Sequence, residues 1–486
     1  MKMKNNAYIR SISAVLLGSM LVSCGSGTVS DDSGTSAETS SDFVSEETKK
    51  AFFEMEDYGG VEFNIHAPDW GLYSNYFNSD EQTGDSMDDA LYERNKKVEE
   101  YLGVKISFEA TGAIEEILKK VQQAVMSQDD SYQLVLTHCI SSVYEMVTTD
   151  LLYDWKDLKY CNFEADYWNH SSMNDLEVNG HSFYAVSDYM LPDPNVILFN
   201  KGLIDQFSLE NPYDIVRSGK WTIDKLIQMA SSVTGDLNGD NKMDAEDRYG
   251  FASESDWLWN SFLYSSQLHM VTRDGNGGYK LDLDKNKMLT LVEKLDTLIN
   301  KSGDAYIYNG NVSEENKLPI SKGRSLFEIT SINRMRTLRE TDVEYGIIPY
   351  PKFDEAQDDY YNNDWSGLMC IPKTVNDPDM VGKVCEMLAY YSGETARPAY
   401  FNLLLGEKLA RDEDSKEMLD LVFKNIVFDP GMNYFGFQSN MMNLFYTFHK
   451  LVINEKKSDY ASWDAKYRGG AEAEIEKFNK AISELE

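Results

Sequence analysis

A short apolar stretch, Asn195–Phe199, is the feature that most constrains how this chain can fold. The four residues after Asn195 are Val-Ile-Leu-Phe, adjacent rather than alternating with polar residues. Such a run is typical of a strand that is covered on both faces. Segments with helical and strand patterns alternate on both sides of it. We therefore interpret it as a buried crossing strand between two α/β lobes, and we expect the function in the cleft between them.

The length and charge of the chain narrow the possible functions. A chain of 486 residues is too long for one ordinary core, so two or three folded units are expected. The formal net charge is −35, which repels nucleic acid and anionic membrane surfaces. This composition favours a neutral or cationic ligand and predicts no nucleic-acid partner.

The first residues have the pattern of a secretory leader. Basic residues precede Ser11–Val22, an apolar run that is too short to span a bilayer. The run ends in Leu-Val-Ser-Cys, which resembles the bacterial lipobox, with Cys24 in the position that receives a diacylglycerol. We predict a lipoprotein signal peptide over residues 1–23. Residues 24–59, rich in Ser, Thr and Gly, are predicted to be a flexible tether.

The folded part is predicted to begin with a parallel sheet. An alternating strand near residues 61–65 is followed by a helix over 88–102 and a strand over 104–108. An amphipathic helix over 114–125 and a strand over 133–136 come next. Strands and helices that alternate in this order indicate a mainly parallel α/β sheet with right-handed crossovers.

An acidic segment over residues 236–247 has the spacing of a calcium-binding loop. Oxygen-bearing side chains occupy loop positions 1, 3, 5, 9 and 12, and a main-chain carbonyl is available at position 7. The predicted ligands are Asp236, Asn238, Asp240, Lys242 through its carbonyl, Asp244 and Asp247.

This loop departs from the usual EF-hand pattern at two positions. Asn241 stands where glycine is usual, and Asp247 stands where glutamate is usual, as in dockerin loops. Asn tolerates the left-handed conformation that position 6 requires. The segment from Asp274 fails as a second loop, so we expect one structural Ca²⁺ rather than a sensor or adhesion module; a solvated acidic turn is the alternative.

Aromatic residues in polar loops are the candidates for ligand binding. Rings beside Asp and Asn suit sugars, because apolar C–H faces stack on rings while hydroxyls form hydrogen bonds. The predicted binding residues are Trp70, Tyr73, Tyr189, Trp257, Trp259, Trp365 and Tyr434. Burial inside a lobe is the alternative for each of them.

The sequence shows no catalytic motif of the common hydrolases. Gly-x-Ser-x-Gly, His-Glu-x-x-His and a phosphate-binding glycine loop are all missing, and the six histidines are scattered. A carboxylate pair of a glycosidase could still hide among the abundant Asp and Glu. Four cysteines remain besides Cys24, and buried free thiols are expected over metal ligation, with one disulfide left open.

Several motifs, in their order along the chain, resemble a known family. The chain resembles the extracellular solute-binding lipoproteins of bacterial carbohydrate ABC importers, in the maltose-binding-protein-like group. The resemblance covers roughly residue 60 to the C-terminus. It rests on residues 89–95 (DALYERN), 199–201 (FNK), 211–213 (NPY), 219–222 (GKWT), the acidic loop with 249–251 (YGF), and 346–352 (GIIPYPK).

The family resemblance implies an α/β, two-lobed, periplasmic-binding-protein-like (type II) fold with a ligand cleft between the lobes. By analogy, lobe 1 comprises residues 60–194 and 328–394, and lobe 2 comprises 195–327 and 395–486. Closure is expected about crossings near Asn195–Asn200 and Phe327–Thr330. The resemblance does not fix the ligand.

The function predicted from the sequence is a non-enzymatic receptor. We expect a monomer on the extracellular face of the cell membrane, held there by the lipid on Cys24, that binds an oligosaccharide and delivers it to the permease subunits of an ABC transporter. The same fold binding a peptide or another small solute is one alternative. A secreted glycan hydrolase is the alternative from a different class.

Overall fold

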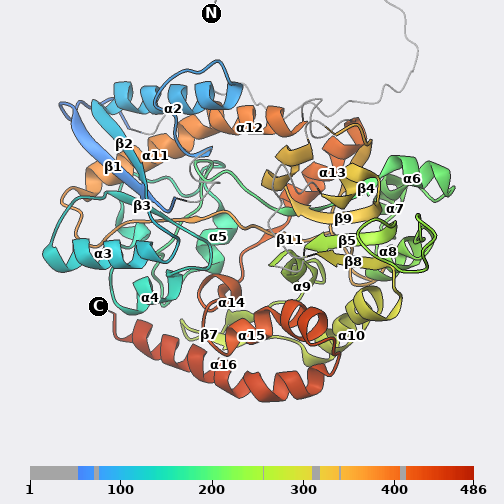
Figure 1. Cartoon of the computed structure of the whole chain (residues 1–486). Helices are drawn as coiled ribbons and strands as arrows, with labels where there is room; N and C mark the ends of the chain where they lie inside the picture. Colours follow the sequence, from blue (N-terminus) through green and yellow to red (C-terminus); the bar gives the residue numbers. More distant parts are fainter. Residues whose placement is uncertain are drawn as a thin grey trace, which may run out of the picture. The chain divides into compact units, whose positions relative to one another are not determined.

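The computed structural model describes residues 53–69, 76–254, 257–308, 318–338, 341–405 and 412–485. By its internal contacts the chain divides into two units, residues 1–50 and residues 51–486, and the described fold belongs to the second. Two main sheets organise this unit, one with four strands and one with five (Figure 1). The α/β class predicted from the sequence is confirmed.

The first sheet has the strand order β12-β3-β1-β2. Its strands are β1 (Val61–Ala67), β2 (Val104–Ala110), β3 (Leu134–Thr137) and β12 (Leu368–Cys370). β1 pairs in parallel with both β2 and β3, as the alternation of strands and helices predicts. β12 is added antiparallel to β3 from far along the chain.

Local chemistry sets the ends of the helix between β1 and β2. Helix α2 (Ser86–Leu102) begins where the Asp85 carboxylate accepts the N–H of Met87 at 2.8 Å. It ends at Gly103, whose φ of 56° lies in the left-handed region that glycine adopts readily. α2 thereby turns directly into β2.

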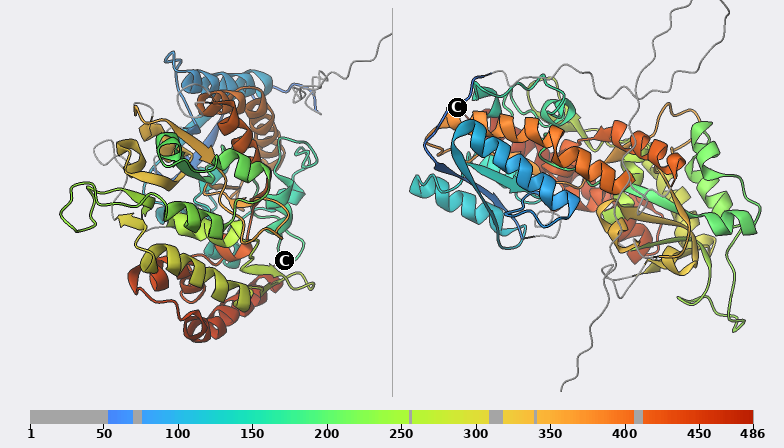
Figure 2. Two further views of the ribbon diagram at one scale, coloured as in Figure 1. Left: turned by 90° about the vertical axis from the view of Figure 1, so that its right-hand side faces the viewer. Right: turned by 90° about the horizontal axis from the view of Figure 1, so that it is seen from above.

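Helices cover both faces of this sheet. α2 lies beside α11 (Pro378–Glu394) and α12 (Ala396–Leu405) on one face (Figures 1 and 2). α3 (Glu116–Ser127) and α4 (Val143–Thr148) lie on the other, and α5 (His170–Asp175) follows in the chain. This sheet with α2–α5, α11 and α12 is called the first half below.

The second sheet has the strand order β10-β4-β9-β5-β8. Its strands are β4 (Asn195–Asn200), β5 (Tyr249–Glu254), β8 (Ala305–Tyr308), β9 (Ser325–Ser331) and β10 (Tyr345–Ile348). Its helices are α6 (Lys201–Gln206), α7 (Pro212–Arg217), α8 (Ile223–Ala230), α9 (Ser261–Ser265), α10 (Lys285–Asp296) and α13 (Glu413–Lys424). This sheet and these helices are called the second half.

The strand predicted from the apolar run is present, but its expected role was wrong. Every residue of β4 is buried, as the unbroken apolar run predicts. However, β4 lies inside the second sheet, where it pairs antiparallel with β9 and with β10. It is therefore not the crossing strand, and neither it nor 327–330 spans the two halves. Residues 345–348, expected in lobe 1, also belong to this sheet.

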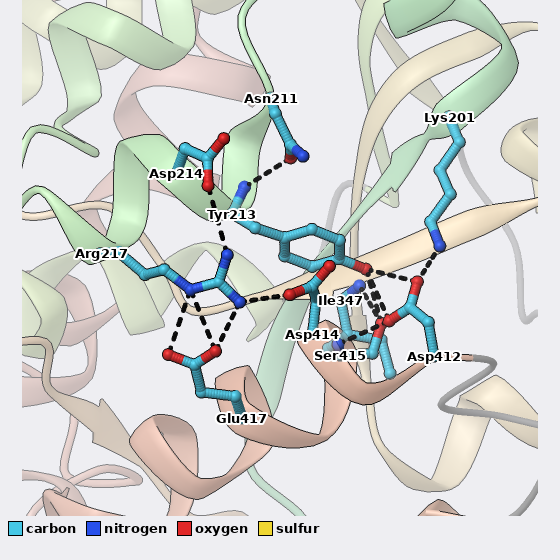
Figure 3. A network of polar contacts seen from close by, with 10 residues as sticks. All are labelled: Lys201, Asn211, Tyr213, Asp214, Arg217, Ile347, Asp412, Asp414, Ser415 and Glu417. Carbon is cyan, nitrogen blue, oxygen red and sulfur yellow. Dashed lines mark hydrogen bonds and ion pairs between the residues drawn. The ribbon is translucent and has the colours of Figure 1, made fainter. Parts of the chain in front are cut away.

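Helix α13 is fixed to the second half by a dense polar network (Figure 3). The Tyr213 hydroxyl contacts Ser415 Oγ at 2.7 Å, and Ser415 Oγ accepts the N–H of Ile347 at 3.2 Å. Arg217 on α7 forms ion pairs with Asp414 and Glu417 at the start of α13. These contacts place α13 beside β10, although α12, just before it in sequence, packs on the first half.

The remaining elements are two small pairs of strands and the last helices of the chain. A small pair joins β11 (Asn362–Asn363) to β13 (Ile426–Val427), and a hairpin joins β6 (Val271–Arg273) to β7 (Tyr279–Leu281). The chain ends in α14 (Pro430–Asn433), α15 (Met441–Phe445) and the long helix α16 (Tyr460–Ser483). Within the described residues, no helix combines the length and apolar character needed to cross a membrane.

The four described cysteines are all free thiols. Cys139, Cys370 and Cys385 are buried and Cys161 is partly buried, as expected for cysteines that pack like small hydrophobic residues.

A buried carboxylate lies in the middle of the second sheet. Glu328 on β9 is fully buried; its carboxylate accepts the Tyr308 hydroxyl at 2.8 Å and the N–H of Ile320 at 2.7 Å. Burial disfavours the ionised form and raises the pKa of Glu328 to about 7 despite these hydrogen bonds.

This burial predicts a pH-dependent loss of stability. The contribution of Glu328 to the stability of the fold is fully present below the pKa of this side chain in the unfolded chain, near 4.5. It is lost as the pH rises from there through the folded-state pKa of about 7. Glu328→Gln should remove that slope, so the unfolding free energy of the parent should fall by up to about 3 kcal/mol relative to that of the variant between pH 4.5 and 8. Urea titrations across this range provide the measurement. Exposed Glu293→Gln is the control and should keep the parent's slope; an unchanged slope in Glu328→Gln would contradict the assignment.

Candidate functional site

The two halves are joined where three chain segments run side by side. Pro194 forms an antiparallel bridge with Asp364, and β11 pairs in parallel with β13. The Asn362 side chain also donates to the carbonyl of Asn195, just inside β4. Residues near 194, 362–364 and 426–427 therefore form the junction. The first of these segments lies at the expected lobe boundary between residues 194 and 195, whereas 362–364 takes the place of the crossing expected at 327–330.

Two buried aspartates fix the junction. The Asp364 carboxylate accepts the N–H of Asp193 at 2.8 Å, and the Asp193 carboxylate accepts the N–H of Asn333 at 2.8 Å. Both side chains are buried, and desolvation raises the pKa of Asp193 to about 7 and raises that of Asp364. Each aspartate thus connects backbone segments that are far apart in the sequence.

Two tryptophans predicted as binding residues meet beside this junction. Trp257 lies at the start of a 3₁₀ turn (Trp257–Asn260) after β5, and Trp365 follows β11. Their ring centroids are 4.6 Å apart and the planes are inclined by 58°. Trp365 is buried, whereas Trp257 is partly exposed. The structure therefore brings together one predicted residue on the second half with one at the junction.

The tryptophan pair is bordered by residues from three other parts of the chain. The His138 ring, just after β3, lies 6.5 Å from the Trp365 ring, and Phe445 on α15 lies 6.1 Å from it. Burial lowers the pKa of His138 to about 4, so its imidazole is neutral at neutral pH. The Arg334 guanidinium lies 5.2 Å from the Trp257 ring centroid. Trp257, Trp365, His138, Phe445 and Arg334 are called the tryptophan cluster below.

The one described cation of this cluster is already paired. Arg334 forms an ion pair with Glu254, the last residue of β5, whose side chain is 5% exposed. A guanidinium held between a carboxylate and an indole face has its charge largely compensated. Among the described residues of the cluster, neutral groups therefore dominate what a ligand could contact.

Unpaired polar groups are buried on the same segments. The Trp365 indole N–H and both side-chain polar atoms of Asn260 have no hydrogen-bond partner among the described residues. The side-chain oxygen of Asn195, beside the junction, is likewise unpaired within that part of the chain. Buried polar groups normally have partners, so these four atoms need a physical reason. A ligand rich in hydroxyl groups would supply both donors and acceptors.

A hollow lies against the other side of the junction from the tryptophan cluster. Its volume is about 400 Å³, and its lining includes Asp364, Trp168, Phe401 and Phe423. Neighbouring residues of an extended segment point to opposite sides. The Asp364 side of the junction thus borders this hollow, while Trp365 belongs to the tryptophan cluster.

Three of the other predicted binding residues lie elsewhere. Trp259 is fully buried and donates to the carbonyl of Glu254 at 3.0 Å, so it packs inside the second half. Tyr189 is fully buried in the first half under the Arg94 guanidinium, 4.6 Å from its ring centroid. Tyr434 is buried and donates to the carbonyl of Leu176 at 2.7 Å. Trp70, Tyr73 and the lipidation candidate Cys24 lie outside the described residues.

Sequence reasoning did not find His138, Glu254 or Arg334. His138 and Glu254 each lie at the carboxyl end of a strand that has a parallel neighbour, which is where α/β sheets place ligand-binding groups. That rule could have identified both. Arg334 follows β9 in a 3₁₀ turn, and nothing in the sequence near it distinguishes it from other basic residues.

The acidic loop has the backbone conformation expected of a calcium loop. Asn241 has a φ of 63°, the left-handed conformation predicted for position 6. The Asp236 carboxylate accepts the N–H groups of Gly239 and Asn241 at 2.6 and 2.8 Å. Asp247 accepts those of Leu237 and Asp244, both at 2.9 Å, and these backbone bonds lower its pKa.

The donor types and the backbone of this loop fit Ca²⁺, but the side chains are not gathered around one point. The carboxylates are bonded to amides of the loop itself, and no group of three or more His, Cys, Asp or Glu suited to a metal occurs in the described residues. If Ca²⁺ binds, Asp236, Asn238, Asp240, Asp244 and Asp247 with the Lys242 carbonyl would hold it, as the loop spacing predicts.

Comparison with known proteins identifies the fold. No family model matches the sequence, and no curated protein matches it. A sugar transporter from Rhizobium etli, in an open conformation, superposes with a TM-score of 0.58 at 12% identity, over 88% of this chain and 100% of that one. The GacH receptor of Streptomyces glaucescens gives 0.55 at 11% identity, over 88% and 100%.

UgpB from Mycobacterium tuberculosis, solved with glycerophosphocholine, gives a TM-score of 0.54 at 13% identity, over 87% of this chain and 98% of that one. At such low identities the similarity shows the fold. The chain therefore has the two-lobed fold of ABC-transporter solute-binding proteins, as the order of its motifs predicts. The expected type II class is confirmed.

Proposed function

We propose that this protein is a substrate-binding receptor of an ABC importer that takes up a carbohydrate. The observation that carries the proposal is the tryptophan cluster, where indole rings from the second half and the junction meet beside buried, unpaired hydrogen-bonding groups. Rings that stack on C–H faces, with neutral donors and acceptors around them, suit a sugar. The fold supports a binding role, since its neighbours are binding proteins rather than enzymes.

The charges favour a neutral oligosaccharide over the alternatives. The net charge of −35 disfavours anionic ligands, and Arg334 is already paired with Glu254. An anionic solute would need a free cation in a buried site. GacH was solved with acarbose, whereas UgpB was solved with glycerophosphocholine, so the fold itself accepts more than one ligand class. Binding of a peptide or another small solute, and hydrolysis of a glycan, are the alternatives that the binding test distinguishes.

The proposed receptor works at the outer face of the cell membrane as a monomer. Its leader and lipobox-like tetrad support export and a diacylglycerol on Cys24. The permease subunits of the importer would be its protein partners. The lipid keeps the receptor near them, and the predicted tether over 24–59 separates the folded unit from the bilayer.

We also propose that the loop 236–247 binds one structural Ca²⁺. The support is the order of oxygen donors and the left-handed Asn241. Arg324, just before β9, donates to the carbonyl of Ala245 at 2.8 Å and pairs with Glu246 at 2.6 Å. An ion in the loop would therefore reinforce a connection to the second sheet, which is a stabilising role.

Sugar binding should depend on Trp257 but not on its neighbour Trp259. In Trp257→Ala, loss of stacking worth about 0.5 to 1.5 kcal/mol should weaken binding about 2- to 12-fold. Trp259→Phe should lower the melting temperature and leave the Kd unchanged, because Trp259 is buried in the second half. Calorimetry with neutral di- to hexasaccharides, and thermal melts of the same samples, provide the measurements.

If no saccharide in the panel binds the parent while a peptide or phosphodiester does, the carbohydrate assignment is wrong. If Trp259→Phe weakens binding more than Trp257→Ala, the site lies elsewhere. Formation of shortened saccharides during prolonged incubation would instead indicate a hydrolase.

Membrane attachment should depend on Cys24. Cys24→Ser removes the acylated thiol, and the variant should be released into the medium because a diacyl anchor is needed for firm attachment. Immunoblots of washed membranes and culture medium measure the distribution. Cys161→Ser, which alters a described free thiol, should stay with the membrane. A Cys24→Ser protein that remains bound after a salt wash would disprove the anchor.

Calcium should raise the melting temperature of the parent, because an ion that binds only the folded state stabilises it by about 2.7 kcal/mol at a hundredfold excess over Kd. Asp240→Ala, which removes the oxygen ligand, should abolish this increase. Asp274→Ala is the matched control, since Asp274 also accepts N–H groups of its own turn but lies outside the calcium spacing. An equal response to calcium in Asp240→Ala and the parent would exclude this loop.

A further inference from the structure

Helix α16 is anchored along the second half. Arg468 donates to the carbonyl of Leu283 at 2.8 Å, and Lys285 forms an ion pair with Asp464 at 3.4 Å. Further along, the Asn479 side chain bonds both the N–H and the carbonyl of Tyr279 on β7, at 2.9 and 2.7 Å. The first part of α16 is therefore fixed to the second half, and its later part to the β6–β7 hairpin.

The end of the same helix contacts the first half. In Figure 1, α16 runs from the neighbourhood of α10 toward α4. The Phe478 ring lies 5.2 Å from the Tyr144 ring on α4, and 5.0 and 5.1 Å from the rings of Tyr434 and Phe435. Phe478 is fully buried. The apolar stripe of the C-terminal helix thus carries a buried side chain that packs against the first half.

Polar contacts accompany this aromatic cluster. The Tyr279 hydroxyl donates to the carbonyl of Glu177 at 2.9 Å, and Arg273 on β6 pairs with the Glu177 carboxylate at 3.1 Å. The N–H of Asn179 donates to the carbonyl of Gly277 in the hairpin turn at 2.7 Å. A Cβ at Gly277, whose φ is 93°, would lie 2.9 Å from the Asn179 side chain. The hairpin is therefore fitted closely against residues 177–179 of the first half.

These contacts lie outside the junction formed by residues near 194, 362–364 and 426–427. Lobes joined only by crossing segments move readily relative to each other, whereas a hydrophobic interface between them restrains such motion. Separating the halves here would expose Phe478 and Tyr144 to water and break the bonds to Glu177 and Asn179. The free energy gained by burying these two aromatic rings, together with the hydrogen bonds, therefore opposes separation of the two halves.

We infer that the end of α16, together with the β6–β7 hairpin, is a strap that holds the two halves together and limits how far they separate. The strap goes beyond the proposed function and does not depend on which ligand binds. Ligand exchange then requires either release of Phe478 from the first half or a motion small enough to leave it in place. A variant without the strap should open more widely than the parent.

The test compares Phe478→Ala with Phe251→Ala in the full chain. Both remove a fully buried phenylalanine, but Phe251 contacts Trp259 inside the second half alone. Small-angle scattering and hydrogen exchange are recorded without ligand, well below both melting temperatures. Phe478→Ala should increase the radius of gyration, and amides of residues 143–148 and 174–179 should exchange about tenfold faster. Phe251→Ala should change neither.

Arg273→Ala provides a second variant that creates no core cavity. It removes the ion pair to Glu177 and should accelerate exchange over residues 174–179, in the same direction as Phe478→Ala and by less. If Phe478→Ala does not fold, Arg273→Ala alone decides the question. The strap is disproved if the radius of gyration and the exchange rates match those of the parent. It is equally disproved if Phe251→Ala produces the same increase, since this would be general loosening.

Discussion

The hydrogen bonds of two buried aspartates at the junction are the interactions on which the arrangement of this protein depends. Asp364 binds the backbone of Asp193, and Asp193 binds the backbone of Asn333, so each carboxylate connects segments more than a hundred residues apart. Burial makes these carboxylates costly to ionise, as the raised pKa of Asp193 shows. They persist because each satisfies backbone N–H groups that would otherwise be buried without partners. The geometry of the tryptophan cluster follows, because Trp365 is the residue after Asp364.

Local sequence patterns predicted the individual elements better than their partners. The amphipathic spacing over residues 114–125 predicted helix α3, and the unbroken apolar run predicted strand β4. The role of β4 was misassigned because burial on both faces is shared by a central strand and by a crossing strand. Only its pairing with β9 and β10 distinguishes the two. Pairing partners so distant in sequence leave no periodic signal in either strand.

The tryptophan cluster, the proposed binding site, was partly predictable for a similar physical reason. Trp257 and Trp365 are large aromatic residues in otherwise polar loops, and this contrast with their neighbours identified them as candidates. The same criterion also selected Trp259, Tyr189 and Tyr434, which are buried with other partners. Polarity of the surrounding sequence cannot distinguish a ring that faces a ligand from one that packs under a loop. Arg334 and His138 carry no local signal of this kind, because their contacts with the tryptophans are purely tertiary.

The late position of β12 affects when the first half can be completed. β12 pairs with β3 at the edge of the first sheet, although its residues lie more than two hundred positions further along the chain. Helices α11 and α12, which pack against α2, also come late in the sequence, after residue 377. Such long-range contacts slow folding, because the intervening chain must be ordered before they form. A growing chain therefore cannot finish its first half until most of the second has been synthesised. For a protein proposed to be exported, completing the first half late would favour a chain that is still unfolded when it is threaded through a membrane.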